Sequence, residues 1–370
     1  MPVGPSDDEA GEVPGPELWD EFCDALKEAG SVVRRDRSPA GELDRAEGYR
    51  YLSRLLRLAL EKFVEHDDPA TPRFYRLSHE TAKIGCDNPD SFYQNAAIDG
   101  RYQYLLRGDR GTVSYLGFGT YYGHYGSGAR SGCSGYLEAD ALEIGADGSF
   151  EITLSAEKRD GNWLPMEADS SMLIVRQNFL DRTRERPATL SIERIGAGGP
   201  PPPLDPAALA RALGSAAAFV KGTAGLFADW AQGFSAHPNE LRPLDPAITG
   251  AAHGDPNIFF YMGYWNLAPD EAMVIEATPP ECEYWNFQLN NYWMESLDYR
   301  YHSVHYNKHT TCYRPDGSFR LIVAHRDPGL ANWVDTAGHG NGTMGLRWAK
   351  ADVHPQPSVR TVKTDRLPRD

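Results

Sequence analysis

The stretch that decides the fold runs from residue 284 to residue 335 and reads YWNFQLNNYWMESLDYRYHSVHYNKHTTCYRPDGSFRLIVAHRDPGLANWVD. It holds aromatic, amide, histidine and carboxylate side chains at a density found nowhere else in the chain. At its start Trp285, Phe287 and Leu289 alternate with amide residues. Because successive side chains of a strand point to opposite faces, this alternation predicts a strand with one core face.

The same pattern occurs twice in the chain, about 170 residues apart. The matching features are Tyr115 with Phe118 and Tyr284 with Phe287, Asp147-Gly148-Ser149-Phe150 and Asp316-Gly317-Ser318-Phe319, Asn162-Trp163 and Asn332-Trp333, and Arg176 and Arg347. Matches that keep both order and spacing indicate an internal duplication. We therefore interpret the chain as two homologous units.

Composition excludes several classes of partner. The chain has 370 residues, 41% of them hydrophobic, and a formal net charge of -15. Such a surface repels nucleic-acid backbones and anionic membranes, so we expect no nucleic acid as partner. No apolar run is long enough to insert into a membrane, and residues 1–16 lack the basic and apolar segments of a secretion signal. The five cysteines form no CxxC pair, which favours reduced thiols and a cytoplasmic location.

Helices are expected on either side of the first unit. Residues 17–29 and 41–65 show apolar residues at three- and four-residue spacings. Asp205-Pro206 provides a start signal for a third helix, which Gly222 or Gly225 could break. The Gly- and Pro-rich residues 196–203 between them predict a linker.

Short strand candidates with turn signals between them fill both repeats. Asp147-Gly148 favours a hairpin turn, and Leu142 with Ile144 before it would share one face with the apolar residues of 150–154 after it. This pattern predicts a mostly β (α+β) protein of two β-sandwich or jelly-roll-like units, which either pack as one body or stand apart. The expected organisation is a disordered tail (1–16), a helical segment (17–85), a first β unit (86–197), a linker with helices (198–252), a second β unit (253–362) and a tail (363–370).

The segments DNPDSFYQNAAIDG, NFQLNNYWMESLDYRYHSVHYNKHT and DGSFRLIVAHRDPGLANWVDTAGH resemble the bacterial family called domain of unknown function 1214. The likeness is fullest in the second unit and covers most of residues 87–350. The resemblance implies a β-rich fold and assigns no chemistry.

Comparison of the two copies singles out polar residues of the second one. Asn286, Gln288 and Asn290 stand where the first copy has Gly117, Gly119 and Tyr121. The second copy is also richer in groups that titrate near neutral pH. Either this copy carries a binding site with the first unit as a wall, or its polar face is simply exposed to solvent.

Histidines of the second copy allow two kinds of site. The first is a metal site of His302, His305 and His309: in a strand His302 and His305 point to opposite faces and could share a metal only at a bulge or bend, whereas in a helix the spacing would serve. An acid/base site is the other reading: His325 and Asp327 begin roughly 6.6 Å apart on a strand and could face one ligand. No nucleophile elbow and no nucleotide fingerprint is present in the sequence.

Two functions stay open at this point. The first is an enzyme that acts on a hydroxylated, partly apolar molecule such as a lipid, steroid or sugar derivative, by acid-base chemistry of His302, His325 and Asp327. The second is a non-catalytic binding or scaffold protein that uses the same cleft. No cofactor or metal is assigned, and an oligomer is possible. The expected ligand-binding residues are Asn286, Gln288, Asn290, Tyr292, Trp293, Glu295, Asp298 and Trp333.

Overall fold

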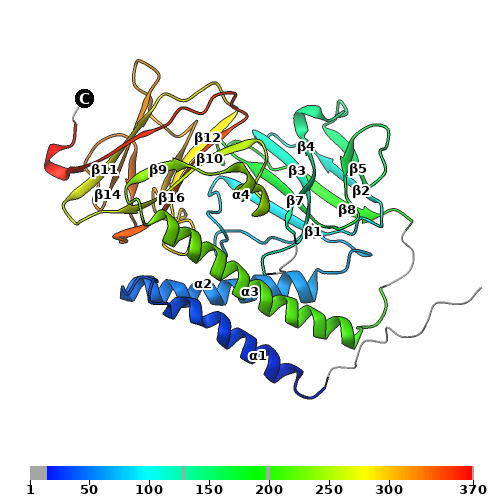
Figure 1. Cartoon of the computed structure of the whole chain (residues 1–370). Coiled ribbons are helices and arrows are strands. Elements are labelled where there is room, and N and C mark those ends of the chain that lie inside the picture. The colour runs from blue at the N-terminus through cyan, green and yellow to red at the C-terminus, as the bar shows by residue number, and fades with distance from the viewer. Residues whose placement is uncertain (1–14, 127–129, 197–200, 369–370) are drawn as a thin grey trace, which may run out of the picture.

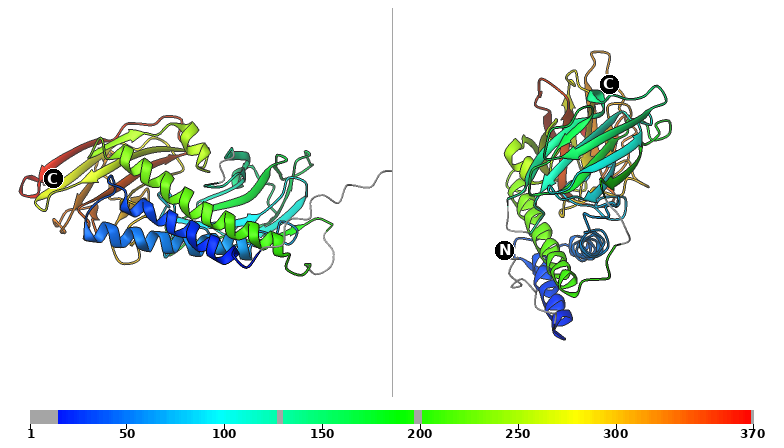
Figure 2. Two further views of the ribbon diagram at one scale, coloured as in Figure 1. Left: turned by 60° about the horizontal axis from the view of Figure 1, so that its bottom comes forward. Right: turned by 90° about the vertical axis from the view of Figure 1, so that its right-hand side faces the viewer.

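The structure, a computed structural model, describes residues 15–126, 130–196 and 201–368. Most of the expected N-terminal tail and the centre of the expected linker therefore lie outside the described residues. Two β units lie side by side, and three helices run across one side of both (Figure 1). Figure 2 shows the same helical layer from two other directions.

The first unit is a sandwich of two four-stranded sheets. Its inner sheet has the order β1-β7-β3-β4 and its outer sheet the order β6-β5-β2-β8. The inner strands are β1 (Ser91–Ala97), β7 (Ser170–Asn178), β3 (Tyr115–Tyr122) and β4 (Gly132–Glu138). The outer strands are β6 (Trp163–Pro165), β5 (Ser149–Ser155), β2 (Tyr104–Asp109) and β8 (Thr189–Arg194).

The second unit repeats this topology strand for strand. Its inner sheet has the order β10-β16-β12-β13 and its outer sheet the order β15-β14-β11-β17. The inner strands are β10 (Ile258–Asn266), β16 (Asn341–Ala349), β12 (Tyr284–Leu289) and β13 (His305–Asn307). The outer strands are β15 (Trp333–Asp335), β14 (Phe319–Ala324), β11 (Glu271–Ala277) and β17 (Ser358–Lys363). The prediction of two homologous β-sandwich units is confirmed.

Each unit has its own core between its two sheets. In the second unit Trp285, Phe287 and Leu289 of β12 are fully buried in that core, as the alternation predicted. In the first unit Leu116 and Phe118 of β3 hold the same places. Burial of large aromatic side chains supplies much of the stabilisation of such a core, because it removes the most apolar area from water.

The prediction of a hairpin around Asp147-Gly148 is correct for the strand after the turn and wrong for the strand before it. Strand β5 forms after the turn, with Phe150 buried as predicted. The residues before the turn form no strand, and Ile144 is exposed. The partners of β5 are instead β2 and β6, which come from more distant parts of the chain. Local alternation could not reveal that long-range pairing.

The helical layer consists of α1 (Leu18–Ala29), α2 (Glu42–Leu60) and α3 (Pro206–Phe234). A π-helical turn, η2 (Glu61–Glu65), extends α2, and 3-10 turns lie at Gly30–Arg34, Ala139–Ala141 and Thr364–Arg366. The side chain of Asp205 accepts a hydrogen bond from the Ala207 amide and so caps α3. Strand β9 (Glu240–Pro243) and helix α4 (Pro246–Ala251) connect this layer to the second unit.

Helix α3 is continuous through Gly222 and Gly225, the two positions where the sequence allowed a break. Its 29 residues span roughly 44 Å at ~1.5 Å per residue, enough to cross both units. At Gly222 a Cβ atom would lie 2.3 Å from the backbone of Gly126 in the first unit. Gly222 therefore allows α3 and the loop at Gly126 to lie in close contact. Among the described residues, no helix combines the length and apolar character needed to cross a bilayer.

Candidate functional site

The central strands of both inner sheets are buried on both faces. Strands β7 and β16 are buried at nearly every position, whereas β8 and β17 of the outer sheets have no fully buried residue. A sheet in a simple sandwich has one face in water, so something must cover the second face of each inner sheet. The covering elements are the helical layer and the segments that lead into β1 and β10.

A cavity of about 180 Å³ lies on these second faces, between the two units and α3. Alternate residues of the central strands line it, while the residues between them point into the sandwich cores. The lining residues from the inner sheets are Ser91, Tyr93, Asn95, Met172, Ile174, Arg176, Asn178, Ile258, Phe260, Met262 and Arg347. Pockets for drug-sized ligands measure roughly 300–1,000 Å³, so this one suits a small molecule.

Arg176 and Arg347 are counterparts in the duplication, and both line the cavity. Arg176 donates hydrogen bonds to the Tyr121 hydroxyl, at 2.7 Å, and to the carbonyl of His253. Arg347 donates to the Gln288 side-chain oxygen, at 2.6 Å, and to the carbonyl of Cys86. Neither guanidinium forms an ion pair among the described residues. Both sites therefore keep positive charge beside the cavity.

Two carboxyl groups also line the cavity and belong to the lead-in segments. Asp255 accepts hydrogen bonds from the hydroxyls of Tyr115, at 2.7 Å, and Tyr136. Asp87 accepts from the amide and the hydroxyl of Ser296. Burial raises the pKa of Asp87, which reduces the negative charge it contributes.

Three further titratable side chains, Lys62, His124 and His253, line the cavity. Lys62 is only 5% exposed, and burial lowers its pKa. Burial also lowers the pKa of His253, to about 4, so its imidazole is neutral at neutral pH. The His124 pKa is lowered by burial as well. The titratable groups of the cavity therefore include two arginines and Lys62 beside two carboxyl groups.

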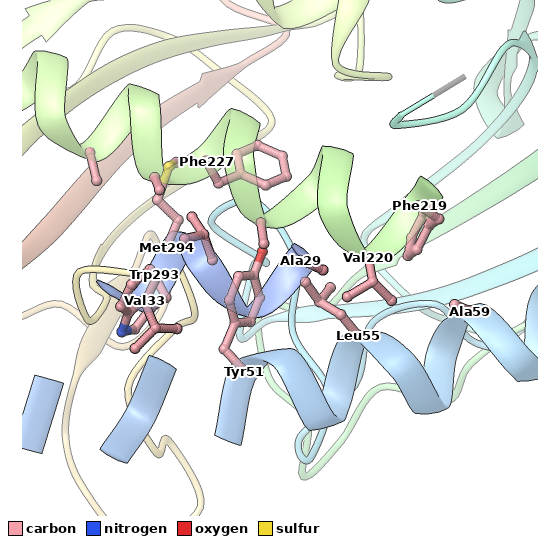
Figure 3. Close-up of a cluster of buried hydrophobic side chains, with 14 of the residues drawn as sticks. Ala29, Val33, Tyr51, Leu55, Ala59, Phe219, Val220, Phe227, Trp293 and Met294 are labelled. Atoms are coloured by element: carbon pink, nitrogen blue, oxygen red, sulfur yellow. The ribbon is translucent and has the colours of Figure 1, made fainter. Parts of the chain in front are cut away.

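The wall opposite the sheets is apolar and comes mainly from α3, which contributes Phe219, Phe227 and Trp230. Phe227 and Trp230 meet edge to face at 5.5 Å. The same helix packs Phe227 into a buried cluster with Tyr51 of α2 and with Trp293 and Met294 of the second unit (Figure 3). The aromatic wall is therefore held in place by packing from three directions.

The amide row of β12 does not face this cavity. Asn286, Gln288 and Asn290 are fully buried, so the face is not exposed to solvent either. Asn286 donates to the Asn88 side-chain oxygen at 2.8 Å, and Gln288 donates to the Asp87 carbonyl at 2.7 Å. The expected ligand-facing row instead binds the segment that leads into the first unit. Its amides are needed because that segment has buried backbone groups to satisfy.

The aromatic and acidic residues after β12 are directed toward the helical layer. The Trp293 indole donates to the Asp44 carbonyl at 2.8 Å. Tyr292 is buried in the same cluster as α2 and α3. Glu295 pairs with Arg54 of α2 at 2.6 Å. These residues dock the second unit on the helices, whereas they had been expected to line a cleft.

The remaining predicted site residues also lie away from the cavity. His302, with 42% of its side chain exposed, contacts Asp335 at 2.8 Å. The His325 ring contacts the Thr336 hydroxyl at 3.0 Å and the Leu267 carbonyl at 3.2 Å. The others have local roles: Asp327 accepts from the Gly329 amide, Asp298 pairs with Arg300 at 2.7 Å, and the Trp333 indole donates to the Ala324 carbonyl. His302, His325 and Asp327 thus make separate contacts with the protein, and none of them lines the cavity.

The three histidines considered for a metal pair with three different carboxylates. His302 contacts Asp335, His305 contacts Asp90 at 3.1 Å, and His309 contacts Asp181 at 3.5 Å. In the part of the chain that the structure describes, no group of three His, Cys, Asp or Glu side chains is arranged to hold a metal ion.

Two signals in the sequence could have pointed to the cavity. Arg176 and Arg347 are kept in both copies, while the amide row and the histidines are not. Lys62 falls three residues after Ala59 and seven after Leu55, on the apolar stripe of the predicted helix. A charged residue on a buried stripe is unusual enough to single out.

Fold and cavity together define a two-unit β-sandwich protein with an arginine-lined, aromatic-walled cavity between its units. The sequence matches a family described as "Protein of unknown function (DUF1214)" over residues 128–177 and 270–352, one segment from each unit. The crystal structure of an uncharacterized protein from Burkholderia cenocepacia is 52% identical and has a TM-score of 0.93, over 95% of this chain and 98% of that chain. The chain belongs to the DUF1214 family.

A more distant likeness shows the fold alone. A crystal structure from Vibrio parahaemolyticus is 12% identical, with a TM-score of 0.51, over 92% of this chain and 100% of that chain. No match was found among curated proteins.

Proposed function

We propose that the protein binds a small, anionic, partly apolar molecule in the cavity between its two β units. The observation that carries the proposal is the meeting of two counterpart arginines and a buried lysine with an aromatic wall. Small-molecule sites are typically concave, mostly apolar and fitted with a few placed polar groups. The ligand class differs from the hydroxylated molecule expected from the amide row, because those amides bind protein.

Charge favours an anion. Arg176 and Arg347 are both buried and form no direct ion pair among the described residues, although the Asp255 carboxylate favours the charged form of Arg176. Each guanidinium has five N–H donors, of which the protein uses only some. A buried cation that lacks a direct ion-pair partner is costly, so an anionic ligand would bind where it relieves that cost.

Shape and wall chemistry favour an apolar body attached to the anion. Phe219, Phe227 and Trp230 offer ring faces and edges to a ligand. Met172 and Met262 on the opposite side are flexible side chains that adapt to irregular ligands. An aromatic or short aliphatic carboxylate combines both requirements in a small volume.

Isothermal titration calorimetry with benzoate and benzamide tests the proposal, since the two ligands differ mainly in charge. Benzoate is expected to bind at least about tenfold more tightly, a difference of roughly 1.4 kcal/mol. Lys62→Met should weaken benzoate binding, while Lys221→Met, on the exposed side of α3, should leave it unchanged. Equal affinity for both ligands would overturn the anionic part of the proposal, and binding of neither would overturn the site.

A further inference from the structure

Lys62 is placed unlike the other buried lysine of the chain. It lies in the π-helical turn that ends α2, a type of turn that occurs frequently at functional sites. Its side chain is 5% exposed and lines the cavity. Among the described residues its ammonium forms no direct ion pair and no hydrogen bond; it lies 4.9 Å from the centre of the Phe63 ring, and the nearby Asp67 carboxylate only partly offsets the lowering of its pKa by burial.

Lys83 shows what a structural buried lysine looks like in the same protein. It is 3% exposed, but it donates hydrogen bonds to the carbonyls of Ser296 and Leu297 and lies over the Tyr299 ring. Those bonds fasten the segment after β12 and explain why a charge is buried there. Nothing comparable explains the burial of Lys62.

We propose that Lys62 is a nucleophilic amine that forms an imine with an aldehyde or ketone group of the ligand held in the cavity. This inference rests on the proposed function, since it assigns chemistry to the same site. Burial favours the neutral form of an amine, and the neutral form is the nucleophile. Lysines desolvated in apolar pockets are activated in this way.

The reaction needs no co-reactant beyond the carbonyl compound. The amine lone pair adds to the carbonyl carbon, a C–N bond forms, and the carbonyl π electrons move to oxygen. A proton passes from nitrogen to that oxygen, and a second proton transfer releases water to leave the C=N double bond. Hydrolysis by water reverses each step.

Proton acceptors for these transfers are present in the cavity. His124 and His253 line it, and burial lowers the pKa of both imidazoles. A neutral imidazole can take a proton from the attacking nitrogen and return it to the leaving oxygen. The His124 ring meets Phe63, the neighbour of Lys62, at 4.9 Å, so it is held on the same side of the cavity.

The arginines give the carbonyl compound an orientation. A ligand that carries both a carboxylate and a carbonyl group would place the carboxylate toward Arg176 or Arg347. Its carbonyl would then be free to reach the amine. The ligand class that fits is therefore a small oxo-acid or formyl acid with an apolar body.

Imine trapping on the full chain tests the proposal. The protein is incubated at neutral pH with para-formylbenzoate and cyanoborohydride, and modified lysines are located by peptide mass spectrometry. The reduced adduct retains the aldehyde without its oxygen. Lys62 is expected to be labelled several-fold faster than Lys83 and than the exposed Lys158. Labelling of Lys158 at the same rate as Lys62, or no labelling of Lys62, overturns the proposal.

Lys62→Arg separates this chemistry from ligand binding and from misfolding. Arg176 and Arg347 still provide positive charge in this variant, so benzoate should still bind, but the fast label should disappear. Fast labelling that persists elsewhere in this variant contradicts the role of Lys62. If benzoate binds to the wild type and no imine is trapped, the imine proposal fails and the proposed function stands. If Lys62 is trapped but benzoate binds no better than benzamide, the anionic preference fails instead.

Discussion

Arg176 and Arg347 occupy the same place in the two β units, and each donates a hydrogen bond to a backbone carbonyl of the other unit. Arg176 of the first unit binds the carbonyl of His253, just before β10, and Arg347 of the second binds the carbonyl of Cys86, just before β1. Both acceptor residues have positive φ, 57° and 62°. The duplication thus produced a reciprocal clamp around the cavity.

Loss of either arginine of this clamp is expected to destabilise the protein. Arg176→Met keeps most of the side-chain volume but leaves the buried His253 carbonyl and the Tyr121 hydroxyl without a donor. An unsatisfied buried polar group costs roughly 1–3 kcal/mol, so the free energy of unfolding should fall by that amount. Denaturant unfolding measures it. The control is Arg107→Met, whose guanidinium is 47% exposed in surface ion pairs and should cost less than about 1 kcal/mol. A more stable Arg176→Met variant would contradict the clamp.

The amide row offers a test of its structural role. Gln288→Met removes two buried hydrogen bonds: the one that Gln288 donates to the Asp87 carbonyl and the one that it accepts from Arg347. We expect the free energy of unfolding to drop by roughly 1–3 kcal/mol in denaturant titrations. Unchanged stability would show that the amide is not needed by the fold and would return it to the ligand-binding role predicted from the sequence.

Close approach of α3 to the first unit can be tested with alanine at two glycines of the same helix. Gly222→Ala would place a Cβ against the Gly126 backbone, so thermal unfolding should occur at a lower temperature. At Gly214 nothing lies within 4 Å of an added Cβ, and Gly214→Ala should raise stability by roughly 0.5–1 kcal/mol through helix propensity. Two equal shifts of the same sign would contradict the packing of α3 on residue 126.

A buried ion pair predicts a pH dependence. His339 of the second unit contacts Glu47 of α2 at 3.0 Å. Burial opposes it, but the Glu47 carboxylate raises the pKa of His339 above its ordinary value of 6.5. The corresponding contact with His339, again against burial, lowers the pKa of Glu47 below 4.5. The stabilisation from the raised pKa of His339 is therefore fully present below pH 6.5 and is lost as pH rises through that raised pKa. The stabilisation from the lowered pKa of Glu47 is present above pH 4.5 and is lost as pH falls through that lowered pKa.

Glu47→Gln should accordingly cost most stability between pH 4.5 and 6.5, and less as the solution becomes alkaline. Urea unfolding of wild type and variant across this range measures the difference. His237→Gln, at an exposed site, is the control. A difference that grows toward alkaline pH would have the wrong sign for this pair.

The sequence predicted the units better than the site because repeats and strand alternation are local or periodic signals. Asn286 and Gln288 stood out as polar residues on a strand, which is correct. Their partner, the segment at residues 86–88, lies about 200 positions earlier, and no periodicity reveals such a contact. His305 illustrates the same point, since its carboxylate partner is Asp90 of the other unit.

The comparison of the two copies also emphasised the wrong class of residue for the cavity. Differences between the copies led to the amide row and the histidines, which became interface and surface contacts. The arginines that are kept in both copies line the cavity instead. In a duplicated protein whose cavity lies between the copies, residues common to both are the better guide.

A crystal structure with para-bromobenzoate tests the central claim most directly, because the anomalous signal of bromine locates the ligand without ambiguity. We predict one bromine site between the two β units, beside the ring of Phe227, with the carboxylate toward Arg176, Arg347 or Lys62. Bromine bound only elsewhere, for instance on the second unit near His302, would contradict the account.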